Sequence, residues 1–296
     1  MNISFRQLRL VSALAETGSV TGAARMMHVT QPTASMQLKD VADAIGLPIY
    51  ELVGRRVYMT EVGNELAQTA RAVSAEWDGF EQRVNALKGY TRGKLRVALV
   101  STAKYFVPRL LGRFCKRYPE IDVSLEVLNR DGVVARLRSN LDDLYVMSVP
   151  PTDLDLVDEV FMANPLVMIC ASANPLAKQK SLSLAELVEQ RFILREEGSG
   201  TRMAVDNCFK KLKFRPNLRL ELGSNEAIKE SVAGGLGISV ISSHALHGNA
   251  REQGVSVLNI AGFPVESHWH VVHPKGKKLS PIASIFKAHL LASTRK

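Results

Sequence analysis

Apolar side chains recur at helical spacing along residues 4–45 and predict three short helices. The stripe of the first helix comprises Phe5, Leu8, Val11 and Leu14. Ser19 and Thr30 are N-cap residues at the starts of the second and third helices. Pro32 is tolerated in the first turn of the third helix, because the N–H that it lacks would be unpaired there. Gly46 ends this helix, and the three helices together predict a helix-turn-helix.

A hairpin and a long helix follow. Residues 49–53 and 57–59 are strand-like, with Arg55 and Arg56 at the tip between them, and residues 61–89 contain no proline. Apolar residues of this helix recur alternately four and three positions apart, which is the pattern of a coiled-coil seam. The seam comprises Leu66, Ala70, Val73, Trp77, Phe80, Val84 and Leu87. Since a lone helix cannot bury such a seam, we expect it to pack on a partner helix, most simply that of a second copy.

From residue 94 onward, strand-like and helix-like stretches alternate. Strands are predicted at 95–100, 121–128, 144–147, 166–170, 192–194, 218–222, 238–241, 255–260 and 269–272. Helices are predicted at 104–118, 132–139, 183–190, 201–212, 225–233 and 281–292. Such alternation favours mostly parallel sheets, and Pro150 and Pro151 divide it into two series that each resemble half of a two-lobed binding domain.

The predicted fold class is α/β overall, in three parts. Residues 1–60 are expected to form a winged helix-turn-helix, and residues 61–90 a linker helix that dimerises. Residues 91–296 are expected to form a periplasmic-binding-protein-like effector domain. In that domain, lobe I comprises 91–161 and 267–296, and lobe II comprises 162–266.

Composition excludes several protein classes. With 46% hydrophobic and 23% charged residues, the chain is not expected to be disordered. No apolar run reaches the roughly 18 residues of a membrane helix, and the first ten residues lack a signal-peptide core. We therefore expect a cytoplasmic protein with no membrane partner. Cys115, Cys170 and Cys208 are too widely spaced for a disulfide framework, so we interpret them as reduced structural thiols.

The net charge of +9 is unevenly distributed. Residues 1–90 contain nine basic and nine acidic residues, so the excess lies entirely in residues 91–296. DNA binding by the N-terminal part must therefore rest on local pattern, while the C-terminal excess suits an anionic small molecule.

Short polar side chains near the start of the third helix suit DNA recognition. A helix that enters the major groove needs such groups near its N-terminus, and two arginines at a hairpin tip suit phosphate or minor-groove contact. The candidate DNA-binding residues are Thr21, Thr30, Gln31, Pro32, Thr33, Ser35, Gln37, Lys39, Arg55 and Arg56. On pattern alone, an ordinary helical bundle with a solvated polar face remains the alternative.

Polar residues also follow the predicted strands of the C-terminal part, where α/β lobes bind ligands against helix N-termini. The candidate effector-binding residues are Ser101, Thr102, Lys104, Asn129, Arg130, Ser148, Val149, Pro150, Arg195, Gly198, Ser199, Thr201, Arg202, Asn225 and Glu226. Each junction taken alone could be a plain turn with capping residues, but five junctions on facing lobes favour a cleft. Around His268, His270 and His273 no carboxylate or cysteine completes a metal site nearby, so we predict structural histidines and no metal.

Several motifs resemble the LysR-type transcriptional regulators. They include Phe5-Arg-Gln-Leu8, Gly18-Ser-Val-Thr21-Gly-Ala-Ala24, Val29-Thr-Gln-Pro-Thr-Ala-Ser35 and Gly54-Arg-Arg-Val57. The resemblance implies that Gln31, Pro32, Thr33 and Ser35 begin the recognition helix and that Arg55 and Arg56 form the wing. Met36 departs from the family, which often has arginine there, and Ala42 replaces a common glutamate. These departures bear on the preferred DNA site.

Further motifs resemble the CbbR branch, the regulators of Rubisco and other Calvin-cycle operons. These motifs are Val100–Phe106, Arg195–Arg202, Glu221–Lys229 and Gly276–Pro281. The resemblance implies a regulator that binds double-stranded DNA as a homodimer or homotetramer and senses a phosphorylated metabolite or nucleotide, with no cofactor. We expect an activator, although the sequence alone leaves repression open. We expect a roughly palindromic operator and an effector that alters the DNA bend and the access of RNA polymerase.

Other functions were weighed against this one. The same class of regulator could sense another carboxylate or an amino-acid-pathway metabolite. A solute-binding protein should begin with a signal peptide, and a transferase should offer a nucleophile or an acid–base pair in the cleft. Neither feature is evident in the sequence, so we predict a regulator that is not an enzyme.

Overall fold

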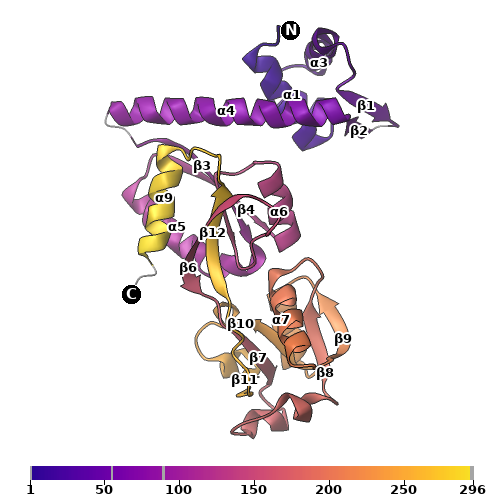
Figure 1. The fold of residues 1–296 in the computed structure, drawn as a ribbon, viewed down its shortest axis with the longest axis vertical. Coiled ribbons are helices and arrows are strands. Elements are labelled where there is room, and N and C mark those ends of the chain that lie inside the picture. The colour runs from indigo at the N-terminus through magenta and orange to yellow at the C-terminus, as the bar shows by residue number, and fades with distance from the viewer. Residues whose placement is uncertain (1, 55, 89–90, 294–296) are drawn as a thin grey trace. The chain divides into compact units, whose positions relative to one another are not determined.

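The computed structural model describes residues 2–54, 56–88 and 91–293, which form two compact units that divide near residue 90. The first unit contains α1 (Phe5–Thr17), α2 (Val20–Met26), α3 (Gln31–Ile45), β1 (Tyr50–Val53), β2 (Arg56–Met59) and α4 (Glu61–Leu87) (Figure 1). Its three helices, antiparallel hairpin and long helix confirm the winged helix-turn-helix that the sequence predicts.

Side-chain caps determine where these helices begin. Ser4 and Gln7 form a reciprocal capping box at the start of α1. Ser19 and Thr30 accept hydrogen bonds from backbone amides in the first turns of α2 and α3, as the sequence predicts. Thr60 caps α4 in the same way. The core between the helices is made of Leu10, Val11, Leu14, Ala23, Ala24, Ala34, Leu38, Val41, Ile49 and Ala67.

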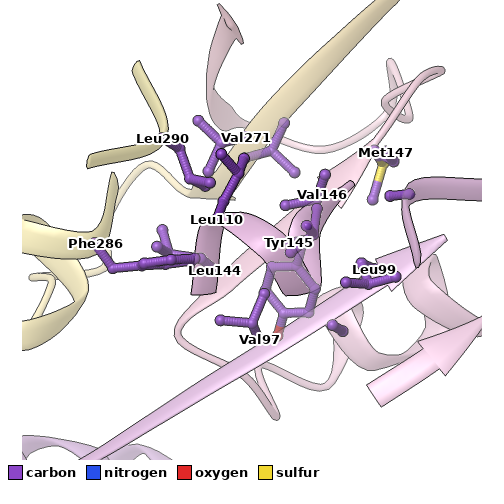
Figure 2. Close-up of a cluster of buried hydrophobic side chains, with 14 of the residues drawn as sticks. Val97, Leu99, Leu110, Leu144, Tyr145, Val146, Met147, Val271, Phe286 and Leu290 are labelled. Carbon is purple, nitrogen blue, oxygen red and sulfur yellow. The ribbon is translucent and has the colours of Figure 1, made fainter. Parts of the chain in front are cut away.

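Lobe I of the second unit is a five-stranded sheet of order β4-β3-β5-β12-β6. Its elements are β3 (Gly93–Val100), η1 (Ser101–Tyr105), α5 (Val107–Arg117), β4 (Ile121–Leu128), α6 (Arg130–Arg138), β5 (Leu144–Met147), β6 (Leu156–Ala163), β12 (His268–Pro274) and α9 (Pro281–Ala292). Helices α5 and α9 cover one side of the sheet and α6 the other (Figure 1). Leu144 of β5 packs with Leu110 of α5 and with Phe286 and Leu290 of α9 (Figure 2).

Lobe II contains β7 (Leu166–Ala171), η2 (Pro175–Lys178), η3 (Leu184–Leu187), β8 (Arg191–Arg195), α7 (Gly200–Lys211), β9 (Asn217–Leu222), α8 (Asn225–Ala233), β10 (Ser239–Ser242), η4 (Ser243–Ala245), η5 (Ala250–Gln253) and β11 (Val255–Val257). Strand β7 lies between β10 and β11, and β8 pairs with β9. A parallel bridge between Phe192 and Ile238 joins the two groups of strands. Successive side chains of the strands face opposite sides, so α7 packs against one core and α8 against the other.

The two-lobed α/β architecture is confirmed, but the sheets are less parallel than the sequence predicts. The β3–β4, β3–β5 and β8–β9 pairs are parallel, whereas β12 is antiparallel to β5 and β6, and β7 is antiparallel to β10 and β11. The chain crosses between the lobes twice, so β6, which leads out of lobe I, and β12, which leads back, run in opposite directions.

Two predicted elements are wrong in kind, and one strand was not predicted. The sequence reasoning missed strand β6 altogether. The helix predicted over 104–118 is a 3-10 turn, η1, followed by α5, whose first turn contains Pro108. The helix predicted over 183–190 is the short 3-10 turn η3. No helix in the ranges that the structure describes is both long and apolar enough to cross a membrane.

Candidate functional site

A small polar pocket lies between the two lobes. The space in and around it that no atom fills, open solvent included, is about 210 Å³. It is lined by Val100, Ser101, Thr102, Asn129, Arg130, Ser148, Arg195, Ser199, Gly200 and Thr201. These residues follow β3, β4 and β5 in lobe I, and β8 in lobe II. The structure thus brings together most of the predicted effector-binding residues at the carboxyl ends of strands, where α/β lobes bind ligands.

Arg195 crosses from lobe II toward lobe I and is almost fully buried. Its Nη1 donates to Thr102 Oγ1 and Asn225 Oδ1, both at 3.3 Å, and its Nη2 donates to Ser101 Oγ at 3.2 Å. Glu196 accepts from Nε at 2.7 Å and from Nη2 at 2.9 Å. The guanidinium therefore links the lobes while a carboxylate of its own lobe neutralises its charge.

A second link between the lobes lies at the start of α8. Lys104 Nζ lies 3.1 Å from Glu226 Oε2, and the Tyr105 hydroxyl donates to Glu226 Oε1 at 2.7 Å. Burial favours the neutral form of Glu226, but hydrogen bonds from Tyr105, Ser224 and Lys104 outweigh it and lower its pKa to about 2. Burial and the bond to Glu226 raise the pKa of Tyr105, so its hydroxyl remains a donor.

Arg130 is the second arginine of the pocket. Its Nε donates to the carbonyl of Val149 at 2.6 Å, and its Nη1 lies 3.4 Å from Oδ1 of the exposed Asp131. In the parts of the chain that the structure describes, the Nη2 group of Arg130 has no hydrogen-bond partner. Arg130 therefore keeps both charge and a donor that can serve an anion.

Helix α7 begins directly at the pocket. Ser199 caps it by accepting from the amide of Arg202, and the first helical residues, Gly200 and Thr201, line the pocket. A Cβ atom on Gly200 would lie 3.1 Å from Ser148 Oγ, so glycine permits this close approach of the lobes. The N-terminal amides and the helix dipole favour a bound anion.

Some predicted effector-binding residues do not line the pocket. Arg202 is the clearest correction: its guanidinium donates to Asp206, to Glu221 and to the carbonyl of Arg195. The i,i+4 spacing of Arg202 and Asp206 was a signal for this pair. The others that lie outside the lining are Lys104, Val149, Pro150, Gly198, Asn225 and Glu226. Among them, Lys104, Asn225 and Glu226 join the lobes, and Gly198 accepts from the amide of Asp131 through its carbonyl.

The N-terminal half of α3 presents polar groups to solvent. Gln31 and Pro32 are exposed, and Gln31 Nε2 donates to Ser35 Oγ at 3.0 Å. The hydroxyls of Thr30 and Thr33 are hydrogen-bonded at 2.8 Å. The remaining candidates on these helices are Thr21 and Lys39, which are exposed, and Gln37, which is half-buried. On the same helix Met36 is 59% exposed, so an apolar side chain shares this surface.

The hairpin leaves a basic side chain exposed at its tip. Arg56 begins β2 and is exposed, while Arg55 lies outside the described residues. The hairpin also exposes Leu52, Val53 and Tyr58.

The predicted seam of α4 divides into two parts. Leu66 packs against the helix-turn-helix core and Ala70 is fully buried, because α1 packs on α4 within the same chain. The sequence reasoning overlooked this internal partner. Val84 is half-buried. The other four seam residues, Val73, Trp77, Phe80 and Leu87, are exposed.

Two histidines of β12 contact charged side chains. His270 Nδ1 lies 2.6 Å from Asp158 Oδ1, so a carboxylate does lie nearby, on the strand that the sequence reasoning missed. Burial lowers the pKa of His273, which contacts Lys287. Among the described residues, no group of three or more His, Cys, Asp or Glu side chains could hold a metal ion.

Comparison with known proteins identifies the family. Residues 5–64 match the bacterial regulatory helix-turn-helix protein model of the lysR family, and residues 88–295 match the LysR substrate binding domain. The chain belongs to the LysR family of transcriptional regulators. The predicted resemblance is thereby confirmed, and a regulator of this family binds DNA through its helix-turn-helix.

Named relatives of this LysR-family regulator match it over nearly their whole length. It is 43% identical to the HTH-type transcriptional activator CmpR of Synechocystis sp., over 98% of this chain and 96% of the relative. It is 40% identical to the RuBisCO operon transcriptional regulator of Allochromatium vinosum, over 99% of this chain and 97% of the relative. The second of these names agrees with the predicted branch of the family.

A solved structure resembles the second unit of this LysR-family regulator. The regulatory domain of Synechocystis CcmR in complex with 2-PG is 45% identical, with a TM-score of 0.66, and the match covers 69% of this chain and 98% of that domain.

Proposed function

We propose that this LysR-family regulator controls carbon-fixation genes and responds to a phosphorylated anion in the pocket between its lobes. The observation that carries the proposal is the pairing of a cation, Arg130, with the N-terminus of α7 across one polar pocket. The names of the relatives support the target genes, and the 2-PG complex of CcmR makes 2-PG the first effector to test.

We further propose how the chain divides its tasks. Residues 1–60 bind DNA, 61–90 pair two chains, and 91–296 bind the effector. The DNA surface comprises the start of α3 and the hairpin, with Gln31 reading bases and Arg56 contacting phosphates. The regulator acts in the cytoplasm, on DNA, as a homotetrameric activator. A promoter-fusion assay measures the direction of its effect, and analytical ultracentrifugation measures its assembly.

The effector proposal is tested with the full chain by isothermal titration and thermal shift. A ligand at about one hundred times its dissociation constant should stabilise the chain by about 2.7 kcal/mol. We expect saturable binding of 2-PG that Arg130→Ala removes and Arg215→Ala, a change at an exposed cation outside the pocket lining, retains. Binding only of simple carboxylates or amino acids would keep the regulator and discard the phosphorylated effector.

The phosphate contact at the hairpin is tested by measuring operator binding at several salt concentrations. Arg56→Ala should weaken binding to every sequence and reduce the slope of log affinity against log salt by about one. The Arg215→Ala variant serves again as the control, because it removes the same charge from the second unit. Equal slopes for Arg56→Ala and the unaltered chain would exclude Arg56 from the DNA contact.

A sensor releases its ligand unchanged, whereas an enzyme converts it to a product. We assign no reaction to the pocket, so incubation of 2-PG with the purified chain should return it unchanged. Conversion of 2-PG by the chain would support the alternative of a transferase-like enzyme on the same α/β domain.

A further inference from the structure

All five N–H donors of the Arg195 guanidinium are directed at protein acceptors. Nε–H and one Nη2–H donate to the two oxygens of Glu196, the other Nη2–H donates to Ser101, and the two Nη1–H groups donate to Thr102 and Asn225. A guanidinium has five donors and no acceptor. An anion can therefore bind Arg195 only by displacing an acceptor that the protein already provides.

Glu196 holds the face of Arg195 that is best suited to an anion. Nε and Nη2 form a planar fork, and their distances of 2.7 and 2.9 Å to the two oxygens of Glu196 are those of a bidentate ion pair. The Arg195 side chain is only 2% exposed and that of Glu196 is 21% exposed. The carboxylate is thus the less enclosed partner, and it can turn toward solvent while the guanidinium stays in place.

The other cation of the pocket has a different environment. Arg130 makes one hydrogen bond to a neutral carbonyl, and its ion pair with Asp131 is longer, at 3.4 Å, with Asp131 66% exposed. The charge of Arg130 is therefore little neutralised, whereas that of Arg195 is matched by a half-buried bidentate partner. An incoming anion meets Arg130 at once and gains Arg195 only in exchange for Glu196.

We propose that Glu196 is an internal competitor for the effector and determines which anions the pocket accepts. The inference rests on the proposed function, since Arg195, which Glu196 holds, lines the same pocket. To displace Glu196, a ligand must present two oxygens to the fork and carry more charge than a carboxylate. A phosphoryl group, with a charge of about −1.5 to −2 and three acceptor oxygens, meets this requirement, and a simple carboxylate does not. Glu196 thereby selects phosphorylated ligands.

The test compares Glu196→Gln with Glu197→Gln in the full chain. Glutamine keeps the shape of Glu196 but carries no charge and has one acceptor oxygen. Glu197 is exposed and lies one residue along the same loop, so its variant removes the same charge from the same segment. We expect Glu196→Gln to bind 2-PG about tenfold more tightly, which is about 1.4 kcal/mol, and Glu197→Gln to bind as the unaltered chain does.

The inference is overturned if Glu196→Gln does not bind 2-PG more tightly than the unaltered chain. If Glu196 merely holds Arg195 in position for the ligand, Glu196→Gln weakens 2-PG binding, and weaker or unchanged binding overturns the inference. Acetate and inorganic phosphate are titrated in parallel. Because both must displace the same carboxylate, Glu196→Gln should tighten the binding of each by a similar factor and bring the weaker ligand, acetate, into the measurable range. Acetate binding that the variant leaves unchanged contradicts the competitor.

Failure of the effector proposal is distinguishable from failure of this inference. If the unaltered chain does not bind 2-PG, the proposed effector is wrong, and inorganic phosphate then decides about Glu196. If Glu196→Gln binds phosphate and the unaltered chain does not, the result supports Glu196 as a competitor. If neither chain binds phosphate, the inference about Glu196 is overturned. If Glu196→Gln does not fold, NMR of the unaltered chain provides the test. The Nε–H resonance of Arg195, assigned by its absence in Arg195→Lys, should shift when 2-PG or phosphate saturates the pocket. An unchanged resonance overturns the inference.

Discussion

The amide of Asn225 donates to the hydroxyl of Thr102 at 3.1 Å, and this bond joins lobe II to lobe I inside the protein. Both side chains are at least 97% buried, and the same hydroxyl accepts from Arg195. Thr102 is therefore a shared acceptor for two donors of the opposite lobe. One oxygen atom thus accepts two of the hydrogen bonds that join the lobes.

Replacing Thr102 by valine should remove that oxygen with little change of volume. The donors of Asn225 and Arg195 would lose an acceptor, at a cost of about 1–3 kcal/mol. We expect a matching loss of 2-PG affinity with operator binding unaffected, measured by titration calorimetry and fluorescence anisotropy. Thr91→Val, at an exposed position, is the matched control. Equal 2-PG affinities in the two variants would exclude Thr102 from this role.

Gly198 should tolerate alanine less well than another glycine with the same backbone conformation. Gly198 has φ +81° and Gly235 has φ +77°, so alanine strains either position by about 1 kcal/mol. Only at Gly198 would the new Cβ meet the opposite lobe, 2.5 Å from Asp131 Oδ2, whereas nothing lies within 4 Å of the new atom at Gly235. Gly198→Ala should therefore weaken 2-PG binding and Gly235→Ala should not. Similar affinities in both would show that the lobes do not need this contact.

The Glu226 link should give the chain a defined acid sensitivity. Folding lowers the pKa of Glu226 from 4.5 to about 2, so its contribution to stability is complete above pH 4.5 and is lost as the pH falls toward 2. The stability difference between the unaltered chain and Glu226→Gln should therefore be larger at pH 7 than at about pH 3.5. Urea denaturation at both values measures it, and a difference that does not change with pH would contradict the assignment. The carboxylate is half exposed, so the effect should be modest.

Gln31→Ala should reduce discrimination between operator sequences. If its amide reads a base edge, the loss is about 1–3 kcal/mol at one operator position. Competition binding with single-base variants of the operator measures the loss, and Gln68→Ala, at an exposed position of α4, is the control. Should discrimination persist at every position, Gln31 does not read a base.

Phe80→Glu should separate paired chains. Phe80 is 49% exposed beside Trp77, with their ring centroids 5.7 Å apart, and a second α4 helix would cover both. Sedimentation velocity should show a smaller species for this variant. Ala72→Glu, exposed on α4 outside the seam, should leave the assembly intact. Assembly that survives Phe80→Glu would place the dimer contact elsewhere.

Helices and strands were predictable from the sequence where their apolar residues are periodic and capping or turn residues mark their ends. The bounds of α8 and α9 agree with prediction because Ser224 and Ser280 cap them. Strand β4 agrees because its apolar and polar residues alternate, and β5 agrees because it is a short apolar run. Strand β6 was missed because Asp158 and Glu159 interrupt its apolar pattern. An edge strand tolerates such residues, since only one of its sides is paired.

The location of the pocket was predictable from the sequence, but the contacts among its side chains were not. The rule that ligands bind at the carboxyl ends of strands identified Ser101, Asn129, Ser148 and Ser199. It could not determine which cations are neutralised, since that depends on three-dimensional partners. Arg202 is occupied by acidic neighbours, and Glu196 was overlooked because a search for an anion site looks for positive charge.

The two crossings between the lobes constrain how they can move. They lie side by side, for the amide of Asn164 donates to the carbonyl of Ser267 at 2.8 Å. Two tied strands resist swivelling about their length more than bending across it, so we expect the lobes to move as a hinged pair. We then expect any ligand that draws Arg130 toward α7 to drive the same motion, whatever the rest of its structure.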